Sequence, residues 1–286
     1  MHAFTPEPFS VYFGLTTDSL TEIYLRPTIA ESMDFDPAKI EIRGPFCAVA
    51  KTLKTTTNFR RFDHQGLWQA RLVDPCFWSP DYPAYYRIRI EQVGQITELI
   101  CGIRRFGAKN GQFWLEGKRW VLRATKLTHV PDLSWQSWRE ARLAIFAGDP
   151  APNLLELATE QGLMLMLDLE QANWSDRLPQ VAKSPAVVIV VVPLDASLER
   201  CRELAPNLLI AKRLPDDKFA SALDQVDVLL CDLGQSSGRT QLHCREKPVI
   251  GYRGSPGLTD LVTARAACDA LQRDLAPEFD LSGYVV

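Results

Sequence analysis

The stretch GIRRFGAKNGQFWLEGKRWVLRAT, residues 102–125, lies where the hydrophobic rhythm of this 286-residue sequence changes. Before it, several short runs alternate apolar with polar residues, which is typical of half-buried strands. After it, short and wholly apolar runs alternate with segments of helical period. Within it, residues 112–118 predict a hairpin that turns at Glu116-Gly117 and would close the bottom of a barrel. We therefore expect a different fold on each side of residue 108.

The first part of the chain predicts antiparallel β structure. Six runs there are rich in β-branched and aromatic residues and are separated by turn residues. They are FSVYFGL, EIYLRPT, KIEIRG, GLWQARLV, AYYRIRIEQV and TELICGIRRF. Their spacing is typical of an immunoglobulin-like sandwich of about a hundred residues. We assign residues 1–108 to a β-sandwich domain.

The second part predicts parallel strands that are covered by helices, because its apolar runs have no polar face. These runs are WVLRAT, RLAIFAGD, LMLMLDLE, AVVIVVVP, LLIAKRL, VLLCDL, PVIGYRG and SGYVV. Eight strands close a (β/α)8 barrel, so we assign residues 109–286 to a short TIM-like barrel with some helices reduced to loops. An open doubly wound sheet is the alternative, but no glycine-rich phosphate loop follows a strand.

Charge and cysteine content restrict the partners. A formal net charge of −3 with interspersed charges argues against a nucleic-acid surface. The most apolar run, residues 186–194, is too short to cross a bilayer, and the N-terminus lacks a secretory pattern. Seven widely spaced cysteines without a Cys-x-x-Cys predict reduced thiols in a cytoplasmic protein. We expect no nucleic-acid partner, no membrane partner, no metal and no cofactor.

Two stretches together resemble glycoside hydrolase family 2, the β-galactosidase and β-glucuronidase family. One is FWSPDYPAYYRIRIEQVG from Phe77, similar to the family's Trp-x-Pro-x-x-Pro-x-Leu-Tyr segment; the other runs from residue 102 to 130. The matching positions in the second stretch are Gly102-Ile103-Arg104, Phe113, Leu115, Gly117-Lys118, Leu122-Arg123 and His129. The resemblance extends to Gly254, with weaker motifs, and implies a sandwich followed by a barrel. It also implies that Arg123 projects inward from the first barrel strand, and that a further N-terminal sandwich domain is missing, so we expect a truncated member.

The resemblance implies the chemistry of retaining glycosidases, in which two carboxylates about 5 Å apart act as acid/base and nucleophile. The family's Asn-Glu pair, which ends the fourth strand, falls on Leu194 and Asp195. The nucleophilic Glu, which ends the seventh strand, falls on Arg253. Leucine cannot hydrogen-bond the 2-hydroxyl of a sugar, and a guanidinium has no lone pair for an anomeric carbon. We therefore predict a degenerate member, a pseudoenzyme in which double displacement cannot run.

Some roles stay open at this point. Asp195 is either a degenerate acid or the cap of the helix that follows it, and it could also form an ion pair with Arg253. Tyr252 could replace the nucleophile, as tyrosine does in sialidases, or simply pack. An inverting scheme would need a second carboxylate about 6.5–9.5 Å from Asp195. The candidates at strand ends are Asp149, Asp168, Glu170 and Asp232.

Two further residues are candidates for contact with a substrate. The resemblance places His129 at the end of the first barrel strand, where members often bind substrate, although a loop histidine is the alternative. Trp174, after the third strand, could stack on a sugar. With Glu170, Asp232 and Tyr252 they form the predicted substrate-binding set.

Three functions remain. The first, which we favour, is a non-catalytic scaffold with a carbohydrate ligand or a protein partner. The second is an active glycosidase with a non-standard acid/base pair around Asp195. The third is an unrelated scaffold role, because a fold does not fix a function.

Overall fold

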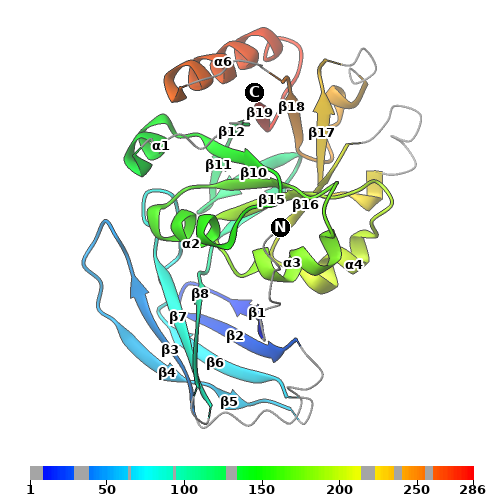
Figure 1. Ribbon diagram of the computed structural model, residues 1–286. Helices are drawn as coiled ribbons and strands as arrows, with labels where there is room; N and C mark the ends of the chain where they lie inside the picture. The colour runs from blue at the N-terminus through cyan, green and yellow to red at the C-terminus, as the bar shows by residue number, and fades with distance from the viewer. Residues whose placement is uncertain are drawn as a thin grey trace.

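The computed structural model describes residues 9–28, 39–63, 66–92, 95–126, 134–213, 223–234, 240–254 and 260–286. A β-sandwich lies at one end of the molecule, and a closed barrel with helix α6 forms the other end (Figure 1). The predicted fold class, an antiparallel sandwich followed by an eight-stranded barrel, is confirmed. No helix in the described ranges combines the length and the apolar character that crossing a membrane requires.

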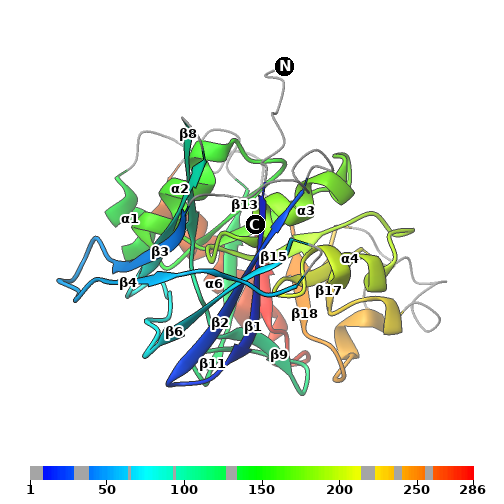
Figure 2. The ribbon, with the colours of Figure 1, turned by 90° about the horizontal axis from the view of Figure 1, so that it is seen from below.

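Two four-stranded antiparallel sheets form the sandwich (Figure 2). The first has the order β1 (Phe9–Thr16), β2 (Leu20–Pro27), β6 (Trp68–Val73) and β5 (Arg60–Arg61), and the second has β4 (Thr55–Asn58), β3 (Lys39–Phe46), β7 (Tyr85–Gln92) and β8 (Gln95–Cys101). Alternate residues such as Ile23 and Leu25 are buried between the sheets, as a period of two requires. Strands β4 and β5 were not predicted, because they are mostly exposed and lack an apolar alternation.

A small three-stranded sheet connects the sandwich to the barrel. Its strands are β9 (Phe106–Lys109), β10 (Gln112–Leu115) and β11 (Lys118–Trp120). The predicted turn is present, with φ values of 51° at Glu116 and 74° at Gly117. Phe113 is fully buried in the barrel core, which fits a hairpin that closes the barrel. The predicted boundary after residue 108 falls inside β9, and the division into two domains stays a prediction.

Eight short parallel strands close the barrel. They are β12 (Leu122–Thr125), β13 (Ala144–Ala147), β14 (Leu165–Asp168), β15 (Val187–Val191), β16 (Leu209–Lys212), β17 (Val228–Asp232), β18 (Val249–Tyr252) and β19 (Gly283–Val285). Every predicted apolar run supplies one of them. All five residues of β15 are buried, because side chains on one face fill the barrel and those on the other meet helices.

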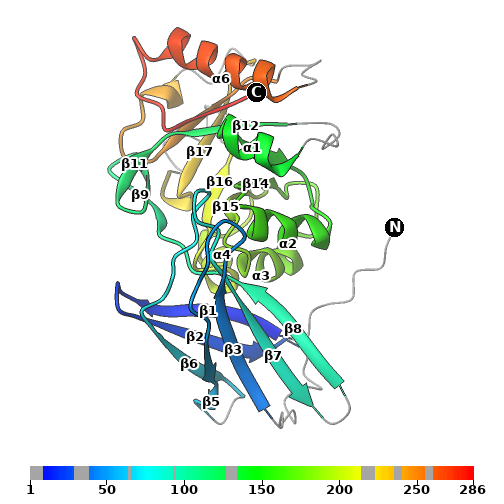
Figure 3. The same cartoon turned by 90° about the vertical axis from the view of Figure 1, so that its left-hand side faces the viewer.

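Five helices within the described ranges lie on the outside of the barrel. They are α1 (Trp135–Ala141), α2 (Pro152–Gln161), α3 (Trp174–Ala182), α4 (Leu198–Leu204) and α6 (Leu261–Leu275). In the described parts of the next two connections only the 3-10 turns η3 (Leu223–Gln225) and η4 (Thr240–His243) occur. Residues 214–222 and 235–239 lie outside the described ranges, so the expectation that some helices are reduced stays a prediction. Helix α6 lies at the end of the molecule opposite the sandwich (Figure 3).

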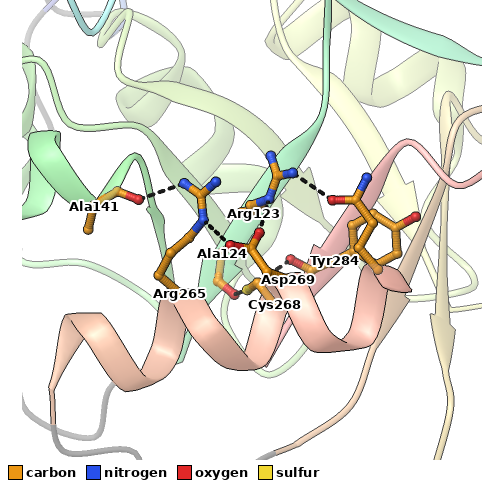
Figure 4. Close-up of polar contacts among 8 residues, drawn as sticks. Arg123, Ala124, Ala141, Arg265, Cys268, Asp269 and Tyr284 are labelled. Carbon is orange, nitrogen blue, oxygen red and sulfur yellow. Dashed lines mark hydrogen bonds and ion pairs between the residues drawn. The ribbon is translucent and has the colours of Figure 1, made fainter. Parts of the chain in front are cut away.

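Arg123 points outward, so its predicted inward direction is wrong. Its Nε donates to Asp269 Oδ1 at 2.9 Å, and its Nη2 donates to Gln272 Oε1 at 2.6 Å, both on α6 (Figure 4). Leu122 and Ala124, on either side of it, are fully buried. Because successive side chains of a strand face opposite sides, the position between them faces the helix layer.

We call the contact between the sandwich and the N-terminal ends of the barrel strands the junction. It is centred on Trp78, Gly102 and Arg104. Trp78 is fully buried, and its Nε1 donates to the Thr159 carbonyl of α2 at 2.7 Å. A side chain at Gly102 would overlap the ring of Pro185, which precedes β15. Arg104 donates to backbone carbonyls, among them that of Pro185 at 2.9 Å. The most specific part of the family resemblance therefore forms the junction.

Candidate functional site

The candidate site is the mouth, which we define as the C-terminal ends of the barrel strands and the loops that follow them. TIM barrels build their active sites at this end. The structure places the predicted residues there as follows: Asp149 after β13, Asp168 and Glu170 at β14, Trp174 at the start of α3, Asp195 after β15, Asp232 at the end of β17, and Tyr252 and Arg253 at β18. His129 lies outside the described residues.

An aromatic contact crosses the interior of the mouth. The ring centroids of Phe146 on β13 and Tyr252 on β18 lie 5.9 Å apart, with the rings at 70° to each other. Two strands, β12 and β19, lie between β13 and β18 in the barrel, so these side chains meet through its interior. Phe146 is 1% exposed. Tyr252 therefore packs on the far wall, and the pair fills space at the end of the barrel where a glycosidase would hold its sugar.

Two of the predicted carboxylates share one arginine. Arg213, directly after β16, places Nη2 at 2.8 Å from Asp168 Oδ2 and forms an ion pair with Glu170 through Nη1. All three side chains are about three-quarters or more buried. The structure thus brings Asp168 and Glu170 together, but as the two carboxylates of an ion-pair network. Both are engaged by a cation that holds the loop after β14 to the end of β16.

The other two candidate carboxylates also have structural partners. Asp149 Oδ1 accepts a 2.6 Å hydrogen bond from Nε of Arg177, a nearly buried residue of α3. Asp232 Oδ1 accepts from the backbone N–H of Gly234 at 2.9 Å, within the loop after β17. Each carboxylate proposed for an inverting scheme thus stabilises a loop. The distance between each of these carboxylates and the carboxylate of Asp195 stays untested.

Asp195 is exposed, on a loop that a buried lysine holds in place. Lys212, 2% exposed at the end of β16, donates from Nζ to the carbonyls of Leu194 at 3.1 Å and Ala196 at 2.5 Å. Burial lowers the pKa of Lys212, although the charge of Asp195 opposes this effect. The side chain that caps α4 belongs to Ser197, so the alternative that Asp195 caps this helix is wrong.

Arg253 lies toward the outside of the barrel. Its Nη1 is 4.0 Å from Asp274 Oδ2 on α6, and its backbone N–H donates to the Val285 carbonyl at 2.9 Å. Its predecessor Tyr252 points into the barrel, as the strand alternation requires. Arg253, which the sequence resemblance aligns with the nucleophile, therefore contacts the helix layer. The ion pair with Asp195 stays a prediction.

The remaining candidates for binding or nucleophilic chemistry have structural environments. Trp174, the first residue of α3, is half-buried against the barrel core. Burial raises the pKa of the Cys101 thiol to about 12 and that of the Cys201 and Cys268 thiols to about 11, which makes them poor nucleophiles. Among the residues that the structure describes, no cluster of three or more His, Cys, Asp or Glu side chains could hold a metal ion.

Three residues that shape the mouth were not predicted from the sequence: Phe146, Lys212 and Arg213. The signal for the two cations was visible, since they end the otherwise apolar run LLIAKR, where a charge needs a partner. Phe146 carried no such signal, because a phenylalanine in a buried strand is ordinary. Phe146 contacts Tyr252 only because the barrel closes and brings β13 and β18 to opposite sides of its interior.

Comparisons with known proteins support the fold. No protein-family profile and no curated protein sequence matches the chain. Among solved structures, it is similar to the β-glucuronidase of Parabacteroides merdae, with a TM-score of 0.62 and 16% identity over 98% of this chain and 47% of that one. It is also similar to a glycosyl hydrolase family 2 member from Bacteroides cellulosilyticus, with a TM-score of 0.64 and 13% identity over 97% of this chain and 44% of that one.

A third similar structure is the β-D-glucuronidase of Dictyoglomus thermophilum, with a TM-score of 0.61 and 12% identity over 98% of this chain and 61% of that one. The chain thus spans less than two thirds of the length of these enzymes. At such identities the likeness concerns the fold. This chain has the sandwich-and-barrel fold of the glycoside hydrolase family 2 structures, as the resemblance of its sequence predicts.

Proposed function

We propose that this chain does not hydrolyse glycosides and that its scaffold serves a binding role. The observation that carries this proposal is the contact of Phe146 with Tyr252 through the interior of the mouth. Retaining hydrolysis needs two carboxylates about 5 Å apart on either side of a sugar ring. Here aromatic side chains occupy the interior, and the arginine at the aligned nucleophile position lies against α6.

The rim of the mouth supports a carbohydrate as the ligand class. Trp174 offers an aromatic side chain that is only half-buried, and Asp232 offers an acceptor for sugar hydroxyls. The solved structures that resemble this fold include enzymes described as β-glucuronidases. A sugar bound at the rim would meet no nucleophile, so binding would proceed without turnover. None of the seven cysteines forms a disulfide, which supports the cytoplasm as the compartment.

The alternative is an active glycosidase that uses Asp195 with another carboxylate. The contacts of Asp168, Glu170 and Asp149 with arginines weigh against it, because an acid/base pair has to reach the substrate. Asp195 keeps this alternative testable, since it is exposed on a fixed loop.

Two assays on the intact chain separate these functions. The first measures turnover of chromogenic β-galactoside, β-glucuronide and β-mannoside, and we expect none above the uncatalysed rate. Hydrolysis that Asp195→Ala abolishes would overturn the proposal. The second measures the melting temperature with galactose, glucuronate or mannose. A rise with one sugar that Trp174→Ala removes supports carbohydrate binding, and no rise with any of them points to a protein partner.

A further inference from the structure

A cavity of about 400 Å³ lies near the junction, away from the mouth. It is bounded by helix α1, the hairpin of β10 and β11, the end of α2 and residues 79–81, which lead out of the sandwich; these elements can be followed in Figure 1. Its volume falls in the range of small-molecule sites, which measure about 300–1,000 Å³. Its apolar wall includes Leu115, Trp120 and Met164.

The charged lining of this cavity is mainly cationic. Lys118, Arg119, Arg139 and Arg142 face two acids, Asp81 and Glu116. Arg119 is already paired, with Asp280 at 2.7 Å. The side chains of the other three cations form no hydrogen bond or ion pair within the part of the chain that the structure describes. Three cations around one cavity thus have no protein acceptor there.

Two buried donors at the cavity also lack acceptors. Trp138 is 0% exposed and lines the cavity, and its indole Nε1 has no hydrogen-bond partner among the described residues. The Nε of the adjacent Arg139 is buried and equally unpartnered within these ranges. Buried N–H groups in native structures nearly always have an acceptor. Every unsatisfied group identified at this cavity is a donor, which indicates an acceptor-rich ligand.

The backbone at the cavity adds an independent observation. Arg142, the C-cap residue directly after α1, has the left-handed conformation, with φ 51° and ψ 44°. Helix α2 ends at the same cavity on Gly162, with φ 76°, which is the ordinary residue for this conformation. Arginine there is strained, and strained positions in proteins cluster at ligand sites. The strained position of α1 places a cation at the cavity.

We propose that this cavity binds a small amphipathic anion, a carboxylate or a phosphate ester that carries an apolar group. Its anionic end would accept hydrogen bonds from Arg139, Arg142, Lys118 and the indole N–H of Trp138. Its apolar end would pack on Trp120 and the aliphatic wall. This site is separate from the mouth and does not depend on the function proposed there.

Titration calorimetry on the full chain tests the proposal with phenyl phosphate, benzoate, inorganic phosphate and phenol. We expect one site for phenyl phosphate or benzoate, and the stronger of the two identifies the anionic group. Phenol and inorganic phosphate, which each lack one half of the ligand, should bind at least about ten-fold more weakly. Arg139→Gln and Arg142→Gln should each weaken binding about ten-fold. The matched change Arg60→Gln, in the exposed strand β5, should leave binding unaltered.

The competing account is that Arg139 and Arg142 only balance the partial negative charge at the carbonyl end of α1. In that case both glutamine variants would lower the melting temperature and leave the affinity for phenyl phosphate and benzoate unchanged. That result, or the absence of binding by both probes to the wild type, would overturn the proposal. Trp138→Phe adds a second readout, because it keeps the ring and removes only the N–H. Weaker binding by this variant, at an unchanged far-ultraviolet spectrum, supports the site.

Discussion

The junction and the mouth lie at opposite ends of the same barrel strands, yet they resemble glycoside hydrolase family 2 to very different degrees. At the junction, Trp78, Gly102 and Arg104 stand in the family's order, and each makes a contact that depends on its identity. At the mouth, the sequence resemblance places Leu194 and Arg253 at the positions of the catalytic amide and nucleophile. The likeness is thus carried by residues that hold two parts of the fold together.

The two ends differ because packing restricts the sequence at the junction, whereas only catalysis would restrict it at the mouth. A close approach such as that of Gly102 to Pro185 leaves no room for any side chain, so the sequence there is restricted whatever the protein does. The mouth needs particular carboxylates only if a bond is to be cleaved. At the mouth of this barrel the structure has an aromatic contact and ion pairs.

The contrast between the two ends predicts that the junction contributes more to the free energy of unfolding than the mouth does. Trp78→Ala removes a fully buried indole and its hydrogen bond to Thr159, and we expect a loss of about 3–5 kcal/mol in the free energy of unfolding. Trp174→Ala, the matched change at the mouth, removes a half-buried side chain and should cost less than half as much. Urea unfolding followed by circular dichroism measures both. Equal losses would contradict the distinction between the two ends.

Lys212 tests whether the mouth keeps its own internal support. Lys212→Met leaves the carbonyls of Leu194 and Ala196 without their donor, and we expect a loss of about 1–3 kcal/mol at neutral pH. Urea unfolding of the variant beside the wild type gives this value. A variant as stable as the wild type at neutral pH would show that the loop of Asp195 does not need the lysine.

The direction in which the contribution of Lys212 to stability changes with pH tests its burial. Because burial lowers its folded pKa below the usual 10.5, the unfolded chain binds more protons in the interval between the two values. The contribution of Lys212 to stability therefore rises as the pH increases toward 10.5. The difference in the free energy of unfolding between the wild type and Lys212→Met should widen over this interval. A gap that narrows would contradict the assigned burial.

Much of the fold could be predicted because hydrophobic period is a local property. Each apolar run after residue 109 became a strand of the barrel, and the turn at Glu116-Gly117 followed from local backbone preferences. The exposed strand β4 could not be predicted, because the Thr-rich segment has no buried face. The inward direction of Arg123 was wrong, because a resemblance in sequence does not fix which side of a strand faces a helix.

The candidate site was less predictable, because its contacts join residues far apart in the chain. Arg213 pairs with Asp168 across 45 positions of sequence, and no local pattern encodes that meeting. The cavity near the junction is similar: Trp138 belongs to the buried core of the barrel. Its indole N–H has no hydrogen-bond partner among the described residues, and this depends on side chains and carbonyls that are distant in the sequence.

Arg213 distinguishes a structural network at the mouth from a disguised active site. Arg213→Gln removes the partner of Asp168 and Glu170 and leaves two carboxylates together, so we expect a loss of about 1–2 kcal/mol on urea unfolding. A neutral variant such as Arg71→Gln, in an exposed ion pair of the sandwich, should lose less than about 1 kcal/mol. Gain of glycosidase activity in Arg213→Gln would mean that the arginine masks a working acid pair, which our proposal excludes.

The smallest expected effect has the opposite sign and bears on the cavity near the junction. Arg142→Gly replaces a residue with φ 51° by the one that adopts this conformation without strain, so it should stabilise the protein by about 0.5–1 kcal/mol. Loss of the side chain should at the same time weaken binding of phenyl phosphate or benzoate. Differential scanning calorimetry with and without these ligands measures both effects on one sample. A gain in stability together with a loss of affinity would show that the strained Arg142 contributes its charge to anion binding. A gain in stability with full affinity would show that the strain at the end of α1 is unrelated to an anion.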